Sequence, residues 1–220
     1  MFFASDNAGP VHPQIMERVI AANTDYAMPY GNDQIMDEVR AAIRTAFEAP
    51  EAIVYLVATG TAANALALAT YCQPWQTIFC SEVAHIQEDE CNAPEFYAGA
   101  AKLTVIPTPD KMTPEGLSAA IEAREVGDIH SAQRGPVSIS QVTERGSVYS
   151  LDEIRALTAV AKGHGLPVHL ARLTGGSEKF DRLLPDFRAT DPKTAMLAGL
   201  AGDVDPDQAV RSGQKTIAAE

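Results

Sequence analysis

The chain has 220 residues, of which 46% are hydrophobic and 21% are charged, and its formal net charge is -12. This composition is typical of a globular protein with an apolar core and argues against disorder over most of the length. An acidic surface repels phosphate backbones and anionic lipids, so it disfavours nucleic acids and membranes as partners.

The cysteines Cys72, Cys80 and Cys91 form no closely spaced metal-binding pair, and reduced thiols in a cytosolic protein are the simplest interpretation. The opening residues, MFFASDNAGP, contain no basic residue and no long apolar stretch, unlike a secretory signal. No apolar run reaches the roughly eighteen residues that a membrane helix needs. We therefore expect a cytoplasmic protein without a membrane partner, and we expect no metal site.

In chain order, the first elements are two helices, a strand and a third helix. Apolar residues recur on one face of residues 12–22, which predicts a helix. A second helix is predicted after a cap at Asn32 or Asp33. The β-rich run AIVYLV, residues 52–57, predicts a buried strand, and residues 62–71 predict a helix of small side chains.

Four further short runs are rich in β-branched residues and predict strands. They are TIFC at 77–80, KLTVI at 102–106, VSISQV at 137–142 and LPVHL at 166–170.

Helices are predicted between these strands. Thr113 precedes a helix that carries Leu117 and Ile121 on its inner face. Ser150 and Glu153 form a capping box, in which each side chain can bond the other residue's backbone amide. This alternation of strands and helices predicts a three-layer α/β sandwich with a mostly parallel sheet, although it does not predict the strand order.

The chain changes character near Arg172. Residues 173–220 have few β-branched runs and weak periodicity, which is typical of short helices and loops. We therefore expect one α/β unit over 1–172 and an irregular or helical tail over 173–220.

The triplet Thr59-Gly60-Thr61 stands between the predicted strand and the helix of small residues. A helix start exposes backbone amides, its dipole favours an anion, and glycine allows close approach. The triplet therefore predicts either a phosphate cradle or an ordinary threonine cap.

Several motifs occur in a fixed order along the chain. They are SDNAGP at 5–10, PYG at 29–31, TGTAAN at 59–64, EVAHIQEDECNAPEF at 82–96 and QVTERGSVYSLDEI at 141–154. Together they resemble the threonine-aldolase branch of the β-eliminating lyases, and within it the phenylserine-aldolase kind. The resemblance implies pyridoxal phosphate as cofactor and the large domain of the aspartate-aminotransferase fold, here incomplete.

The resemblance also implies roles for particular residues. Gly60 and Thr61 would hold the cofactor phosphate. His85 would stack on the cofactor ring and accept the substrate's β-hydroxyl proton, because an imidazole has a flat face and titrates near neutrality. Ser5 and Arg172 would bind the substrate carboxylate, for which a guanidinium is well suited.

Three acidic residues follow His85 closely in its motif. Glu90, five residues beyond His85, is a candidate support for the site. In the alternative interpretations, the run Glu88-Asp89-Glu90 is only a solvated face, or it attracts a metal ion without enough ligands to bind one.

The chain departs from the family pattern at two functional positions. The family's strand ends in His-Leu/Met-Asp-Gly-Ala-Arg, whereas this chain has His169-Leu170-Ala171-Arg172. The missing Asp would pair with the pyridine nitrogen, and Ala171 has no carboxylate for this purpose. The lysine that binds the cofactor has no clear counterpart, and Lys179 is the candidate.

The function implied by the resemblance is cleavage of a β-hydroxy-α-amino acid to glycine and an aldehyde, impaired in this chain. The expected partners are a small amino-acid substrate and further copies of the chain, as a dimer or tetramer. One alternative is a non-catalytic, truncated relative that binds pyridoxal phosphate or another phosphate, or that dimerises. A weaker one is a nucleotide-binding α/β domain, although the chain lacks the usual glycine-rich spacings.

Overall fold

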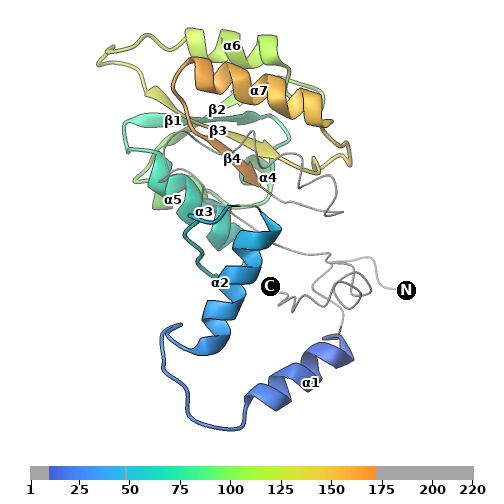
Figure 1. Cartoon of the computed structure of the whole chain (residues 1–220). Helices are drawn as coiled ribbons and strands as arrows, with labels where there is room; N and C mark the ends of the chain where they lie inside the picture. Colours follow the sequence, from blue (N-terminus) through green and yellow to red (C-terminus); the bar gives the residue numbers. More distant parts are fainter. Residues whose placement is uncertain (1–9, 48, 172–220) are drawn as a thin grey trace.

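A parallel sheet forms the centre of the protein, with helices on both faces (Figure 1). The computed structural model describes residues 10–47 and 49–171. Within these residues the strand order is β2-β1-β3-β4, and every neighbouring pair is parallel. The strands are β1 (Gln76–Ser81), β2 (Lys102–Ile106), β3 (Gln133–Ser140) and β4 (Val168–Ala171). The predicted three-layer α/β fold is therefore confirmed, and the predicted tail at 173–220 lies outside the described residues.

The helices differ widely in length. None of those in the described residues is long and apolar enough to cross a bilayer. They are α1 (Pro13–Ala22), α2 (Gln34–Ala46), α3 (Gly60–Tyr71), α4 (His85–Glu88), α5 (Ala93–Tyr97), α6 (Pro114–Glu122) and α7 (Leu151–Gly163).

One face of the sheet packs against α6 and α7. Phe79 of β1 and Val137 of β3 are fully buried there, against Leu117 and Ile121 of α6 and Leu157 of α7. Leu117 and Ile121 are the inward positions that helical periodicity predicts for α6. Burial of such apolar side chains is the main favourable contribution to folding.

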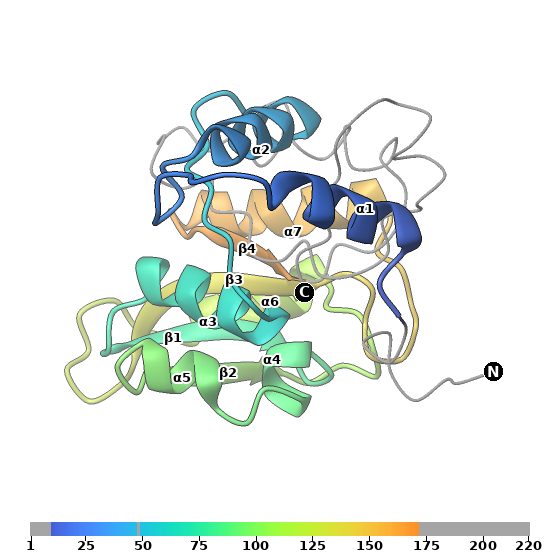
Figure 2. The ribbon, with the colours of Figure 1, turned by 90° about the horizontal axis from the view of Figure 1, so that it is seen from below.

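The opposite face packs against α3, α4 and α5, which Figure 2 shows together in front of the sheet. Ile78 and Cys80 of β1 alternate with Phe79 and so point to this side, where they meet Leu68 of α3 and Ile86 of α4. Both faces of β1 are therefore apolar, as expected for a central strand of a parallel sheet.

Side-chain caps fix the starts of several helices. Asp33 accepts a hydrogen bond from the amide of Met36 at 2.9 Å. In the predicted capping box, the Glu153 amide donates to Ser150 Oγ at 3.2 Å and the Ser150 amide donates to Glu153 Oε2 at 2.7 Å. These bonds satisfy amides that a helix start leaves unpaired.

Most predicted elements are present, with shifted ends. The strand at 102–106 has its predicted bounds, whereas β3 begins before and ends before its predicted range, and β4 ends one residue later than predicted. Helix α3 begins at Gly60 instead of Ala62. Sequence reasoning did not predict α4 and α5, because helices of 4 and 5 residues are too short to show periodicity.

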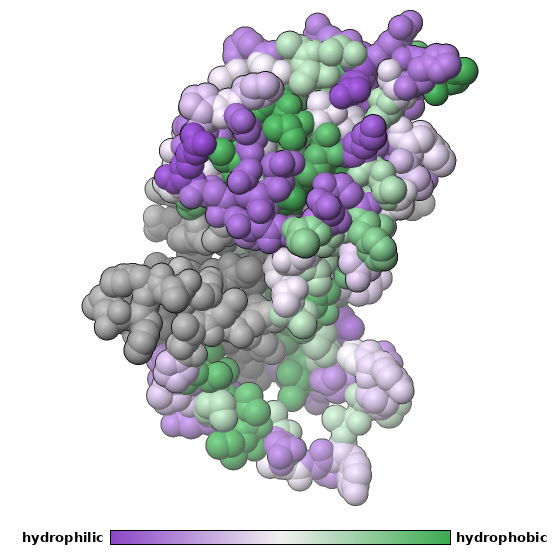
Figure 3. Space-filling model, turned by 180° about the vertical axis from the view of Figure 1, so that it is seen from behind, coloured by the Kyte–Doolittle hydropathy of each residue, from purple (hydrophilic) through white to green (hydrophobic). Residues whose placement is uncertain are grey.

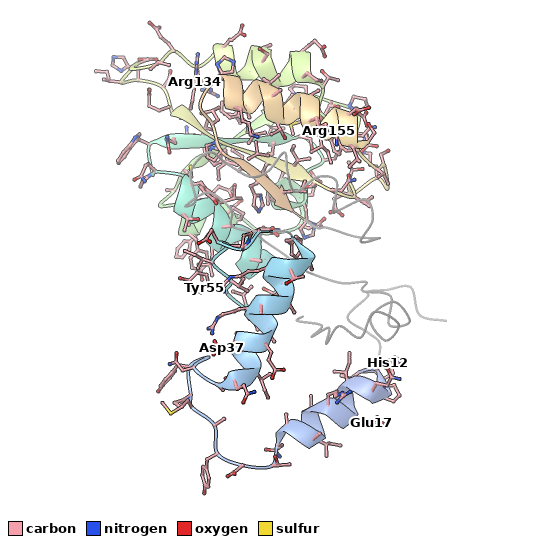
Figure 4. All side chains as sticks on the ribbon, in the orientation of Figure 1. His12, Glu17, Asp37, Tyr55, Arg134 and Arg155 are labelled. Carbon is pink, nitrogen blue, oxygen red and sulfur yellow. The ribbon has the colours of Figure 1, made fainter. Side chains whose placement is uncertain are left out.

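The prediction of a strand at residues 52–57 is wrong. This segment is without regular secondary structure, and its side chains Ile53, Tyr55 and Leu56 are 58%, 72% and 43% exposed. Tyr55, labelled in Figure 4, lies on the connection between α2 and α3. A strand requires a neighbour for its backbone hydrogen bonds, and no part of the described chain provides one here. β-rich composition alone does not supply that neighbour.

Helix α1 is predicted correctly but packs weakly. None of its residues is buried, and Met16, Val19 and Ile20 are 44%, 56% and 67% exposed. Figure 3 shows apolar side chains gathered on the surface over this helix. An isolated helix of 10 residues is only marginally stable in water, so α1 has an apolar face without a partner in the described chain.

Candidate active site

Polar residues gather at the carboxyl edge of the sheet. Strands β1 and β3 are neighbours and end in Ser81 and Ser140, and the carboxyl ends of parallel strands meet at one edge. His85 follows β1 closely as the first residue of α4, and its backbone amide donates to Ser140 Oγ at 3.2 Å. This bond places His85 at the carboxyl edge, next to the end of β3.

The start of α3 has exposed amide groups. Thr59 is the N-cap, and its Oγ1 accepts from the Ala62 amide at 3.1 Å. The Ala63 amide donates to the Thr59 carbonyl at 3.1 Å. The preceding amides, of Gly60 and Thr61, make no hydrogen bond to any described residue, and both residues are half-buried. They are therefore available to an anion, which the helix dipole also favours.

A hydrogen bond connects the first turns of α3 to the neighbourhood of His85. Asn64 of α3 donates from Nδ2 to Glu90 Oε1 at 2.6 Å, and both side chains are buried. The same Glu90 oxygen lies 3.7 Å from His85 Nε2. The structure thus brings together Gly60 and Thr61, through Asn64 and Glu90, with His85.

Burial governs the protonation of Glu90. It raises the pKa of the Glu90 carboxyl above its ordinary value, while the hydrogen bond from Asn64 and the nearness of His85 act in the opposite direction. Glu90 Oε2 and Asn64 Oδ1 are buried without a hydrogen-bond partner among the described residues. The interpretation of Glu90 as part of a solvated face is therefore wrong, because the Glu90 side chain is buried against Asn64 of α3.

The other nitrogen of His85 faces two carboxylates. His85 Nδ1 lies 2.7 Å from Glu144 Oε1 and 3.7 Å from Asp89 Oδ2. The three ligand atoms all lie within 4.8 Å of one another. Sequence reasoning predicted no metal site and did not select Glu144, which lies 59 residues from His85. No local spacing signal connects residues so far apart.

Strand β4 ends in the segment where the chain departs from the family pattern that its motifs resemble. Ala171 is fully buried and is the register partner of Ser140. Its carbonyl accepts from the Gln141 amide at 3.0 Å. The methyl group of Ala171 therefore lies at the same edge as His85, where a carboxylate would be needed to pair with a pyridine nitrogen.

Three candidate residues from the sequence lie outside the described residues. They are Ser5, Arg172 and Lys179.

The parallel sheet, its helical layers and the polar carboxyl edge fit part of the large domain of the aspartate-aminotransferase fold, as the motifs imply. A family model described as beta-eliminating lyase matches residues 3–179. The chain therefore belongs to the beta-eliminating lyase family.

Curated relatives point to one branch of this family. The low specificity L-threonine aldolase of Pseudomonas aeruginosa is 38% identical over 169 residues, which cover 76% of this chain and 48% of that protein. The probable low-specificity L-threonine aldolase of Schizosaccharomyces pombe is 30% identical over 116 residues, covering 51% of this chain and 30% of that protein. The chain spans about half the length of the Pseudomonas relative that it matches.

Solved structures agree with the fold. The threonine aldolase of Leishmania major superposes with a TM-score of 0.70 at 27% identity, over 76% of this chain and 48% of that one. The serine palmitoyltransferase of Sphingomonas wittichii superposes with a TM-score of 0.58 at 14% identity, over 80% of this chain and 44% of that one. The second likeness shows the fold alone.

The described residues suit the phosphate group of pyridoxal phosphate but not the nitrogen of its ring. The amides of Gly60 and Thr61, which make no hydrogen bond to a described residue, suit its phosphate. At the end of β4, Ala171 offers no acceptor side chain for the ring nitrogen.

Proposed function

We propose that this chain forms part of a pyridoxal-phosphate-dependent aldehyde-lyase of the threonine-aldolase type. The reaction is cleavage of a β-hydroxy-α-amino acid to glycine and an aldehyde, and we propose that the chain carries it out with reduced efficiency. The family and the relatives named L-threonine aldolase support the reaction class.

The observation that carries this proposal is the link between the start of α3 and His85. Asn64, near the exposed amides of α3, bonds to Glu90, and Glu90 lies against His85. A phosphate held at Gly60 and Thr61 would therefore leave the rest of the cofactor near the imidazole. In this arrangement the amides bind an anion and the imidazole covers a ring and accepts a proton.

Each residue has a separate task in the proposed reaction. The bound cofactor supplies an electron sink for the pair that remains when the Cα–Cβ bond breaks. His85 accepts the β-hydroxyl proton of the substrate. Ser5 and Arg172 hold the substrate carboxylate, and Lys179 is the candidate for covalent attachment of the cofactor. These last three roles rest on the resemblance to the family.

Reduced efficiency follows from Ala171. A carboxylate beside the ring nitrogen keeps that nitrogen protonated and so strengthens the electron sink. A buried methyl group at the end of β4 does not. We therefore expect cofactor binding without strong activation.

The test is to add pyridoxal phosphate to the purified chain and measure binding by absorbance. L-threonine and phenylserine are then supplied, and release of their aldehydes is followed with and without the cofactor. Slow, cofactor-dependent aldehyde release that is lost in His85→Ala supports the proposal, with Gln87→Ala on the same short helix as the control. Borohydride reduction followed by mass spectrometry identifies any attached lysine. The proposal fails if no aldehyde forms, or if a nucleotide binds more tightly than the cofactor.

A non-catalytic role as an assembly partner is the second candidate, and α1 favours it. This helix has no buried residue, yet it presents Met16, Val19 and Ile20 to the surface. We propose that a second copy of the chain covers this face, as a dimer or tetramer.

The free thiols at Cys72, Cys80 and Cys91 support a cytoplasmic location.

A further inference from the structure

We propose that a cavity at the amino edge of the sheet, where its strands begin, binds a small organic anion. The ligand is a carboxylate or phosphate group carried on an apolar or aromatic body. The cavity measures about 350 Å³, which is within the range of small-molecule sites. It is formed by the starts of β1 and β2 and by the loop that leads into β3, near Arg134 in Figure 4. This inference does not depend on the proposed function.

The cavity is separate from the candidate active site. Gln76 and Thr77, at the start of β1, line the cavity, whereas Ser81, at the end of β1, leads to His85. A strand rises about 3.3 Å per residue, so the two edges of the sheet are about 16 Å apart along β1. A small ligand in the cavity therefore lies beyond contact with His85.

The cavity is basic although the chain is acidic. Lys102, Arg124 and His130 line it, and no Asp or Glu is among the described residues that do so. The whole sequence has 29 acidic and 17 basic residues, so this lining departs from the average surface. Asp128, in the neighbouring loop, accepts hydrogen bonds from the His130 amide and from the Ser131 side chain. The cavity therefore attracts anions locally.

A chain of hydrogen bonds holds the Arg124 guanidinium in place. Thr77 Oγ1 donates to the Lys102 carbonyl at 2.8 Å, so Thr104 must donate in the 2.6 Å contact between the two hydroxyls. Thr104 Oγ1 then accepts from Arg124 Nη2 at 3.1 Å. Thr77 is fully buried, which anchors the chain in the sheet. Arg124 is therefore oriented before a ligand arrives, and this lowers the entropic cost of binding.

The charges of Arg124 and Lys102 have no counter-ion in the described part of the chain. Arg124 is half-buried and bonds through its side chain only to Thr104 among the described residues. Its remaining N–H groups are available to a ligand. A planar guanidinium binds a carboxylate or a phosphate through two parallel hydrogen bonds, so these two groups are the expected heads of the ligand.

Apolar side chains beside the cations indicate the rest of the ligand. Trp75 and Ile129 line the same cavity and are 63% and 89% exposed. An exposed indole offers a flat face on which an aromatic ring can stack. A fixed guanidinium next to an exposed indole favours an anion with an apolar body over a bare inorganic ion.

The test uses the fluorescence of Trp75, which is the only tryptophan in the sequence. Phenyl phosphate and benzoate are titrated into the cofactor-free chain, and calorimetry measures the same titrations independently. Saturable binding of either supports the proposal, and the tighter ligand identifies the anionic group. The neutral counterparts, phenol and benzamide, should bind about tenfold or more weakly. Inorganic phosphate should bind more weakly than phenyl phosphate.

Variants show whether the ligand occupies this cavity. Arg124→Met removes the guanidinium and should weaken binding by about tenfold or more. Lys102→Met should weaken it by about twofold to fivefold, and the Lys102 side chain takes no part in the chain of hydrogen bonds. Arg155→Met is the matched control, because Arg155 pairs with Asp152 on α7, and it should leave the affinity unchanged. Thermal unfolding reports whether each variant is folded.

Three results would overturn the inference. Equal affinities for an anion and its neutral counterpart, or for phenyl phosphate and inorganic phosphate, would contradict the stated ligand chemistry. Unchanged affinity in both Arg124→Met and Lys102→Met would place the ligand outside this cavity. If neither fluorescence nor calorimetry detects saturable binding, the two cations only balance the carbonyl end of the neighbouring helix α6.

Discussion

Ala171 is a single residue on which the chemistry of the proposed site depends. It is fully buried at the end of β4, in register with Ser140. The family pattern that the motifs resemble has Asp after the strand's His-Leu pair, whereas this chain provides only a methyl group there. In the proposed site, this one side chain thus decides whether a bound cofactor would also be activated.

We predict that Ala171→Asp raises the affinity for pyridoxal phosphate by about tenfold or more, since a charge-assisted hydrogen bond contributes about 1.5 to 3 kcal/mol. Without cofactor the same variant should have a lower Tm than wild type, because an unpaired buried carboxylate is destabilising. Cofactor titration by absorbance and thermal unfolding measure the two effects. Ala171→Asn is the uncharged control, and equal affinities of the Asp and Asn variants would contradict the explanation.

The pairing of β3 with β4 also places a titratable group in the core. His169 of β4 is opposite Ser138 of β3, and Ser138 Oγ lies 2.9 Å from His169 Nδ1. His169 Nε2 has no hydrogen-bond partner among the described residues. Burial lowers the pKa of His169 from 6.5 to about 4. The strand pair therefore requires a neutral imidazole.

This requirement predicts acid sensitivity of the β3–β4 pair. The pKa of His169 is lower in the folded chain than in the unfolded one, so the unfolded chain takes up the proton first as the pH falls. The associated stability is complete above pH 6.5 and is lost as the pH falls towards about 4. Relative to His169→Gln, wild type should lose about 3 kcal/mol of unfolding free energy over this range.

Urea unfolding at a series of pH values measures this difference. His130→Gln, at an exposed position, is the control and should follow the wild-type curve. Parallel curves for wild type and His169→Gln would show that burial of this histidine does not govern the acid response.

At the scale of the whole molecule, helices cover both faces of the sheet, whereas the described chain buries no residue of α1. Helices α6 and α7 cover one face of the sheet, and α3, α4 and α5 cover the other (Figures 1 and 2). Helix α1 lies apart from these layers (Figure 1), and its exposed face is apolar (Figure 3). A large exposed apolar patch is typical of an interaction surface.

We predict that the wild-type chain is a dimer or tetramer and that Val19→Glu reduces its oligomeric state. Val19 is 56% exposed, so the substitution should change the unfolding free energy of the isolated chain little. Light scattering after size exclusion measures the mass. Glu17→Gln is the control. Glu17 lies on the same helix and is labelled in Figure 4. A monomeric wild type, or an unchanged mass in Val19→Glu, would refute the role of α1.

Local residue order was sufficient for most elements and for part of the site. The capping box at Ser150 and the inward positions Leu117 and Ile121 depend on neighbours within one helix, so periodicity and cap chemistry predict them. The start of α3 at Gly60, with Thr59 as its cap, is likewise local, because one helix start contains all of it. The family motifs added His85 as a candidate residue and pyridoxal phosphate as the implied cofactor.

Tertiary structure alone decided the features that join distant segments. Residues 52–57 have the composition of a strand but no neighbour in the described chain, so they do not form one. Glu90 is acidic, yet the packing of α3 buries it against Asn64. Glu144 meets His85 only because β1 and β3 are neighbours and end at the same edge. Strand pairing is a long-range contact, and no local pattern of side chains encodes which strands become neighbours.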